Sequence, residues 1–384
     1  MRVYLSKMQV ECKYKDKCSG CQYLEIPLEE QHQRKAKELS GLLHSAQIPF
    51  NGRLEVISPA PSGLRDRADL VWEAGSLGLY EKYSPGQQKR VLDLEQCQQM
   101  SQPLQAWLTE IRKVQWPIKK GSLRLRVGPQ GQRGIWLDFA NVDVKALLDE
   151  KTLLLDLMSR ATVEIGQRHK VLTLVDGVLK LKDPVPQVWF QSFIDDQAVD
   201  LFCSIGTFTQ PGLKANAALT KVIDTWLTEV GSERVLEFGS GIGNLSFPAL
   251  GNHRSLVACE IDSEALTGFK KSLEVLSQQP GFSDIAERVT VQQGDFQNRN
   301  PQDFKNYDTV LVNPPRSGLK DFLAPLIDES RKPKNFLYMS CFPESFVADA
   351  VKLVAAGYEL KKLTIVDQFP QTTHYEVLSL WQLS

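Results

Sequence analysis

At positions 308–316 the chain reads Asp308-Thr-Val-Leu-Val-Asn-Pro-Pro-Arg316, and further along it reads Asn335-Phe-Leu-Tyr-Met-Ser-Cys341. Each segment is a short apolar run that stops abruptly at polar or Pro residues. This pattern is typical of two buried strands of a parallel sheet whose carboxyl ends open into loops. Because ligands of open α/β sheets bind at those ends, the two loops predict one pocket with Cys341 at its edge.

The same strand and helix alternation begins upstream of these two segments. We expect strands at 234–238 and 255–260, a strand and loop at 289–295, a helix at 216–230, and a helix at 263–277. Strict alternation of this kind predicts a doubly wound, Rossmann-like α/β domain. At 384 residues the chain is long enough for two domains, and we place the catalytic domain at residues 206–384.

Residues 1–205 show a different pattern. An amphipathic helix follows Pro27, and alternating segments separated by Gly and Pro turns run from about Glu55 to Gly134. A helix at 143–160 and further strands at 170–193 follow. This order predicts an α+β domain built on an antiparallel sheet with one polar face.

The composition is that of an ordinary globular protein, with 42% hydrophobic and 24% charged residues and a net charge of −1. Neither a signal peptide nor a membrane span is expected, so we expect a cytoplasmic protein. We also expect a monomer. The segment between Glu110 and Asp138 contains seven cations and no acid. That stripe suits a nucleic-acid phosphate backbone, and it is equally compatible with a solvated face.

Four of the seven cysteines form a pattern, which is Cys12-x5-Cys18-x2-Cys21 followed by the distant Cys97. Cytosolic thiols stay reduced, so such a group indicates a metal centre rather than disulfides. Four thiolates can hold zinc or a [4Fe–4S] cluster. Zinc ribbons usually pair two short Cys-x-x-Cys hooks, whereas Cys97 stands alone. The three-plus-one spacing therefore favours the iron–sulfur cluster, with zinc as the alternative.

A glycine turn follows the strand at 234–238, with Gly239 and Gly241 in the sequence Gly-Ser-Gly-Ile-Gly-Asn. Such a turn lets backbone approach a ligand closely, although it is also compatible with tight packing alone. Glu260 ends the next strand and is placed to accept hydrogen bonds from ribose hydroxyls. Asp295 follows the third strand and could accept a hydrogen bond from an adenine amine. Together these features favour S-adenosylmethionine (SAM) over a dinucleotide.

Two further side chains fit covalent chemistry. Cys341 ends a buried strand beside the Asn313-Pro-Pro-Arg316 loop, and Glu376 precedes the apolar run Val-Leu-Ser-Leu-Trp near the carboxyl terminus. An inert buried thiol is the alternative for Cys341. A thiolate, a carboxylate and a methyl donor in one pocket predict a nucleophile and a general base.

With these motifs in view, the chain resembles the iron–sulfur-containing RNA uracil-C5 methyltransferases. The resemblance covers nearly the whole length, from the cysteine pattern and the glycine turn to Asn-Pro-Pro-Arg-x-Gly, Ser-Cys and Phe-Pro-x-Thr-x-His-Tyr-Glu-Val. Only eleven residues precede Cys12, so we expect no amino-terminal TRAM domain. This layout and Asn313 are similar to the shorter enzymes that modify 23S ribosomal RNA.

The resemblance implies a role for each of these residues. Cys341 would add to C6 of uracil, and Glu376 would remove the C5 proton after methyl transfer. Gln210, Gly239, Gly241, Glu260, Asp295 and Asn313 would bind SAM, and Cys12, Cys18, Cys21 and Cys97 would hold the cluster. The implied partner is RNA with an unpaired target, 23S ribosomal RNA first and transfer RNA as the alternative. A catalytically silent RNA-binding homologue is the third hypothesis.

The chain departs from the family pattern at three places. The motif Phe-x-Gln-x-Asn is interrupted, because Asn216 lies six residues after Gln210. Where relatives often have Phe-Cys-Gly in the glycine turn, this chain has Gly239-Ser240-Gly241, so an adenine-stacking aromatic is missing there. Phe342 follows the nucleophile, where relatives usually have Asn. These departures concern the substrate more than the type of reaction.

Overall fold

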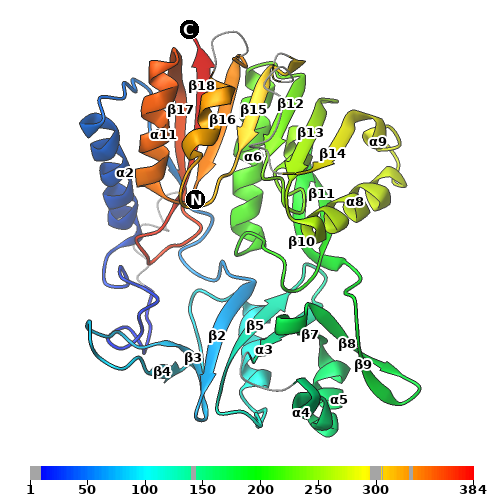
Figure 1. Cartoon of the computed structure of the whole chain (residues 1–384). Coiled ribbons are helices and arrows are strands. Elements are labelled where there is room, and N and C mark those ends of the chain that lie inside the picture. Colours follow the sequence, from blue (N-terminus) through cyan, green and yellow to red (C-terminus); the bar gives the residue numbers. More distant parts are fainter. Residues whose placement is uncertain (1–9, 140–143, 295–303, 305, 328–331) are drawn as a thin grey trace.

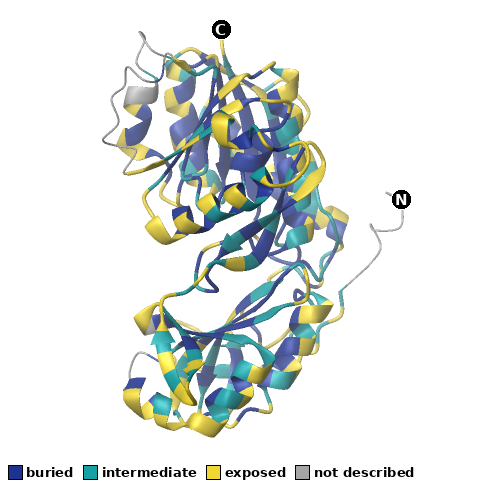
Figure 2. Cartoon of the chain, turned by 90° about the vertical axis from the view of Figure 1, so that its right-hand side faces the viewer, coloured by how far each residue is buried: buried dark blue, intermediate teal, exposed yellow. Residues whose placement is uncertain are grey.

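The computed structural model describes residues 10–139, 144–294, 304, 306–327 and 332–384. Figure 1 shows two bodies, an upper one that contains the carboxyl-terminal half and a lower one built on a second sheet. Figure 2 shows that buried residues concentrate inside each body, beneath an exposed outer layer. Within the described residues, no helix is both long and apolar enough to cross a membrane.

The upper body is organised on a mixed sheet of eight strands. In sheet order these are β1 (Glu55–Ile57), β17 (Tyr358–Val366), β18 (Glu376–Leu383), β16 (Asn335–Ser340), β15 (Thr309–Val312), β12 (Arg234–Phe238), β13 (Ser255–Glu260) and β14 (Val289–Gln293). Only β18 runs antiparallel, between β16 and β17. Strand order reverses between β12 and β15, which creates a switch point at their carboxyl ends.

Helices cover both faces of this sheet, as the alternation of strands and helices predicts. The helices of this body are α2 (Leu28–Ser45), α6 (Leu213–Glu229), α7 (Ser246–Ala249), α8 (Ser263–Ser277), α9 (Ile285–Arg288), α10 (Leu323–Leu326) and α11 (Pro343–Ala355). Successive strand residues alternate between two apolar clusters. Val235 packs with α6, α7 and α8, whereas Leu236 packs with α2 and α11. The predicted α/β fold is therefore confirmed.

The amino-terminal part of the chain contributes directly to this body. Helix α2 lies beside α11 at the edge of the upper body (Figure 1), and β1 pairs in parallel with β17. The hairpin of β10 (Gln187–Ile194) and β11 (Gln197–Cys203) packs on α6 and α8. Within the described residues, the predicted unit 1–205 thus supplies strand β1, helix α2 and the β10–β11 hairpin to the body that carries residues 206–384.

The lower body contains a second sheet of eight strands, antiparallel except between β6 and β7. In sheet order these are β4 (Val91–Asp93), β3 (Ser76–Tyr80), β2 (Arg67–Glu73), β5 (Lys120–Val127), β6 (Arg133–Asp138), β7 (Thr162–Ile165), β8 (Lys170–Val175) and β9 (Val178–Lys182). Its helices are α3 (Gln102–Ile111), α4 (Val144–Asp149) and α5 (Lys151–Arg160). The helix predicted at 143–160 is therefore two helices.

The two bodies are joined by a polar clasp around the segment 204–209. Arg126 is fully buried, donates to the carbonyls of Ser204 (3.1 Å) and Ile205 (3.2 Å), and donates to the Thr209 hydroxyl (2.8 Å). Glu164 accepts from the Ile205 backbone N–H at 2.8 Å. Because both side chains come from the lower sheet, they fix the segment that enters the catalytic fold.

Most cations of the stripe at 110–138 are bound within the protein. Arg112, Lys120, Arg124 and Arg133 form salt bridges with Asp93, Glu73, Asp69 and Glu110, and Arg126 lies in the clasp. The four salt bridges lie within the lower body, and Arg126 links that body to the upper one. Five of the seven cations of the stripe therefore have partners within the protein, and binding of a phosphate backbone by the stripe stays a prediction.

Candidate functional site

A cavity of about 420 Å³ opens at the switch point of the catalytic sheet. Gly239 and Gly241 line it from the turn after β12, with φ of 75° and 55°, a conformation that only glycine adopts without strain. In the same turn, a Cβ at Gly243 would lie 2.4 Å from the Phe269 ring of α8. The glycines therefore allow both the turn and its close packing against that helix.

Glu260 and Asn313 face the same cavity from the ends of β13 and β15. The Glu260 carboxylate accepts from the backbone N–H groups of Gly241 (2.8 Å), Ile261 (2.8 Å) and Asp262 (2.9 Å). These bonds fix the carboxylate at the cavity wall and tie the glycine turn to β13. The predicted cofactor residue Asp295 lies outside the described residues.

Gln210 lies away from the residues that line this cavity. Its side chain is buried, and its Oε1 accepts from Gln368 Nε2 at 2.9 Å. The displaced Asn216 is also buried, on α6, where its amide pairs reciprocally with Asn244 of the glycine turn (2.8 and 2.7 Å). Asn216 therefore has a structural role, because it holds the glycine turn against α6.

Cys341 and Glu376 come together through the antiparallel strand β18. Ser340 at the end of β16 pairs with Val377 of β18, so the next position of this register sets Cys341 opposite Glu376. Arg316 extends from the loop after β15, the strand on the other side of β16. Glu376 is 4% exposed; its Oε1 accepts from Gln368 Nε2 at 2.8 Å, whereas its Oε2 has no hydrogen-bond partner among the described residues.

The electrostatics couple these three side chains. Burial raises the pKa of Glu376 to about 7, against smaller lowering effects of the Gln368 hydrogen bond and the Arg316 charge. Burial also raises the pKa of the Cys341 thiol; the Glu376 charge raises it further, and the charge and hydrogen bond of Arg316 lower it. Thiolate and carboxylate therefore disfavour each other, and the guanidinium favours both anions.

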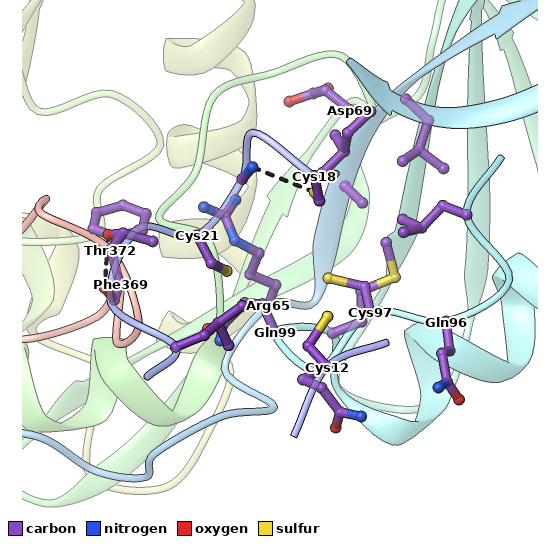
Figure 3. Close-up of a pocket in the computed structure, with 18 residues that line it drawn as sticks. Cys12, Cys18, Cys21, Arg65, Asp69, Gln96, Cys97, Gln99, Phe369 and Thr372 are labelled. Carbon is purple, nitrogen blue, oxygen red and sulfur yellow. Dashed lines mark hydrogen bonds between the residues drawn. The ribbon is translucent and has the colours of Figure 1, made fainter. Parts of the chain in front are cut away.

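The four predicted metal ligands line a second cavity, of about 220 Å³, between the lower sheet and the loop after β17. Figure 3 shows Cys12, Cys18, Cys21 and Cys97 around this space. A bridge between Cys18 and Glu81 attaches the cysteine loop to the end of β3. Cys97 is held by Gln105 of α3, whose Oε1 accepts from the Cys97 N–H at 2.8 Å.

The chemistry of this donor set fits a cationic centre. Burial first, and then the charges of Cys97, Cys18 and Cys12, raise the pKa of Cys21 to about 12. Four clustered thiolates therefore need a positive group to hold them deprotonated. Within the described residues, no three His, Cys, Asp or Glu side chains converge closely enough to share one metal ion.

Three residues that the sequence analysis did not assign also belong to these sites. Phe208 and Ile261 line the switch-point cavity and are 68% and 64% exposed, so apolar surface is available there for a ligand ring. Gln368 bridges Gln210 and Glu376. Phe208 is the first residue of the Phe-x-Gln motif, and Gln368 directly precedes the Phe-Pro-x-Thr motif, so the sequence offered a signal for both residues. It offered none for Ile261.

A Rossmann-like sheet with a cavity at its switch point is an arrangement that suits a SAM-dependent methyltransferase. The family model described as tRNA (Uracil-5-)-methyltransferase matches residues 192–382. The chain is 48% identical over 375 residues to an uncharacterized RNA methyltransferase of Bdellovibrio bacteriovorus, covering 97% of this chain and 95% of that protein. The chain belongs to the SAM-dependent RNA uracil-5-methyltransferase family.

More distant relatives have assigned targets. The chain is 25% identical to the 23S rRNA (uracil(1939)-C(5))-methyltransferase RlmD of Shewanella halifaxensis, over 97% of this chain and 81% of that protein. The crystal structure of Pyrococcus abyssi tRNA (uracil-54, C5)-methyltransferase in complex with S-adenosyl-L-homocysteine superposes with a TM-score of 0.68 at 18% identity, over 95% of this chain and 86% of that chain. At 18% identity, the similarity to the P. abyssi enzyme shows a shared fold.

Proposed function

We propose that this enzyme methylates C5 of one uridine in 23S ribosomal RNA through a covalent bond between Cys341 and C6 of the base. The observation that supports the proposal is the register of β16 and β18, which brings the backbone positions of Cys341 and Glu376 opposite each other, together with the effect of the Glu376 charge on the pKa of the Cys341 thiol. The curated RlmD relatives, matched over 97% of the chain, support ribosomal RNA as the substrate.

The reaction begins at the thiol. Cys341 loses its proton to solvent, and its sulfur bonds to C6 while the C5–C6 electron pair moves toward O4 as an enolate. The Arg316 guanidinium, which lowers the pKa of Cys341, favours the thiolate and the enolate charge. SAM, when bound in the switch-point cavity, supplies an electrophilic methyl group to C5.

Glu376 then completes the reaction. Its carboxylate removes the C5 proton, the C5–C6 double bond re-forms, and Cys341 leaves C6 as a thiolate. The coupling between the two side chains suits this order, because a sulfur bound to C6 carries no charge. Once the Cys341 sulfur is bonded to C6, the negative charge of an ionised Glu376 is no longer opposed by a neighbouring thiolate. A pKa of about 7 is well matched to a base at neutral pH.

The predicted cofactor residues divide into two groups in this proposal. Gly239, Gly241, Glu260 and Asn313 would hold SAM at the cavity wall. Asp295, which lies outside the described residues, stays a predicted contact of the adenine. Gln210 would act outside this cavity, next to the proposed general base Glu376, through its hydrogen bond with Gln368. A variant pair tests this division, because Glu260→Gln should weaken SAM binding strongly and Gln210→Leu should affect turnover more than SAM affinity.

We further propose that Cys12, Cys18, Cys21 and Cys97 hold a [4Fe–4S] cluster with a structural role. The cavity that they line and the repulsion among their thiolates support it. Protein purified without oxygen should contain about four iron and four sulfide per chain. One zinc and no sulfide would contradict the cluster. The predicted cytoplasmic location and monomeric state stay predictions.

One experiment tests the reaction and names the substrate. The enzyme is incubated with labelled SAM and separate transcripts of unmodified 23S ribosomal RNA and transfer RNA, beside Cys341→Ala and the control Cys259→Ala, a buried thiol in β13. We expect label in 5-methyluridine from ribosomal RNA, lost only in Cys341→Ala. Label from transfer RNA alone would favour the target named for the P. abyssi enzyme. No label, with SAM binding intact, would favour a silent binder.

A further inference from the structure

The loop between β17 and β18, residues 367–375, ends at the general base Glu376. Its polar contacts are made largely with residues from the amino-terminal end of the chain, more than 300 positions away in sequence. The position of the base therefore depends on a segment far from the catalytic motifs.

The first contact is a buried ion pair. Lys35 of α2 donates to Asp367 Oδ1 at 2.8 Å and to the Phe369 carbonyl at 3.3 Å, and the charged side chains of Lys35 and Asp367 are both 0% exposed. The backbone N–H of Phe369 donates to the same Asp367 oxygen at 3.2 Å. Because a buried charge without its partner is costly, this pair fixes the beginning of the loop on α2.

The second contact is a reciprocal amide pair. Gln31 Nε2 donates to Gln371 Oε1 at 2.9 Å, and Gln31 Oε1 accepts from the Gln371 backbone N–H at 2.8 Å. The Gln371 carbonyl accepts from the backbone of Gln22 (3.0 Å) and Tyr23 (2.9 Å), directly after Cys21. Gln371 has a φ of 68°, which a residue other than glycine keeps only where its surroundings impose it.

The third contact is with the cysteine cavity itself. Phe369 and Thr372 line that cavity together with the four thiols (Figure 3), and the Arg65 guanidinium lies 5.3 Å from the centre of the Phe369 ring. One loop therefore forms a wall of the metal site and leads to the base. Gln368 lies in the same loop, between Asp367 and Phe369, and its Nε2 donates to Glu376 Oε1 at 2.8 Å.

We propose that the amino-terminal segment 21–35 is the positioning element for Glu376, with Gln31 and Lys35 as positioning residues and Gln368 as the link to the carboxylate. This inference rests on the proposed function, because it assigns a role to residues that hold the proposed base. It also gives the cysteine centre a role, which is to keep the wall that leads to the base in place.

The test separates base positioning from binding and nucleophilic attack. RNA that carries 5-fluorouridine has no C5 proton to remove, so the covalent Cys341 adduct accumulates without the help of Glu376. A variant that misplaces only the Glu376 carboxylate should form this adduct at the normal rate, but it should methylate natural RNA slowly. The variants are Gln31→Met and Gln371→Met, with Gln33→Met on the exposed side of α2 as the control.

For Gln31→Met we expect turnover to fall by about tenfold or more. Adduct formation and SAM affinity should stay unchanged, and amide hydrogens of residues 367–376 should exchange faster. Gln31→Glu, which keeps the acceptor for the Gln371 N–H, should lose less. Because each glutamine also bonds to carbonyls of its own, Gln31 to Ile26 and Gln371 to Pro61, the double variant Gln31→Met/Gln371→Met should lose less than the sum of the two single changes.

Two results would overturn the inference. Normal turnover and exchange in Gln31→Met would show that the amide pair does not position the base. Equal losses of adduct formation and turnover would show a general structural effect instead. If the wild-type enzyme formed no adduct with any 5-fluorouridine RNA, the proposed function itself would fail, and this inference with it.

Discussion

Replacing Glu376 by Gln should stabilise the folded protein at alkaline pH while it removes activity. Burial raises the pKa of this carboxyl from 4.5 to about 7. The folded chain therefore keeps the proton up to about pH 7, whereas the unfolded chain releases it near pH 4.5. Stability from the protonated carboxyl is fully present below the lower value and is lost as the pH rises through the upper one.

The magnitude follows from these two values. A pKa that rises from 4.5 to about 7 corresponds to about 3 kcal/mol in the free energy of unfolding. Gln carries no charge at any pH, so the variant lacks this loss. We expect it to exceed the wild type by about 3 kcal/mol above pH 8, with the difference shrinking to near zero in acid.

Urea denaturation across a pH series, followed by tryptophan fluorescence, measures this difference. Glu237, whose pKa burial raises to about 8, titrates in the same range, but it is present in both proteins and cancels in the comparison. The exposed variant Glu287→Gln controls for the loss of one negative charge. A difference that does not change with pH, or a variant less stable than the wild type in alkali, would refute the reasoning.

Three further perturbations have defined outcomes. Asn216→Ala removes the amide pair with Asn244 and should lower the free energy of unfolding by about 2 kcal/mol in urea denaturation, and it should weaken SAM binding measured by calorimetry. Arg126→Met deprives the carbonyls of the clasp of their donor and should cost about 3 kcal/mol; an unchanged urea midpoint would contradict this assignment. Cys97→Ser should remove the iron and sulfide while SAM affinity stays normal, and full retention of iron would show that Cys97 is not a ligand.

Much of the catalytic fold was predictable because its signals are local. Strands β12 and β13 and helix α8 have the bounds that the apolar runs predict, and their polar ends line the switch-point cavity. Buried parallel strands must be apolar throughout, and the loops after them must stop that pattern. The same local reading failed for Arg126, since a charge pattern does not reveal whether a cation faces solvent or a distant carbonyl.

The amino-terminal segment shows the opposite case. Nothing in its own sequence indicates that α2 packs beside α11, or that β1 extends the catalytic sheet next to β17. The pairing of Gln31 with Gln371 crosses 340 positions, and neither glutamine lies in an unusual local pattern. Such contacts depend on which elements become neighbours, and this choice is made by packing of the whole body.

The sequence by itself determined the fold class, the family and the residue types that carry the chemistry, because strand periodicity and short motifs are local properties. Only the tertiary structure decided what each of these residues faces. Insertion of β18 between β16 and β17 brings the backbone of Glu376 opposite that of Cys341, and the loop that ends at Glu376 lines the cysteine cavity. The physical reason is that burial and the distances between charges set the pKa of Glu376 and Cys341, and both are fixed only when the chain folds.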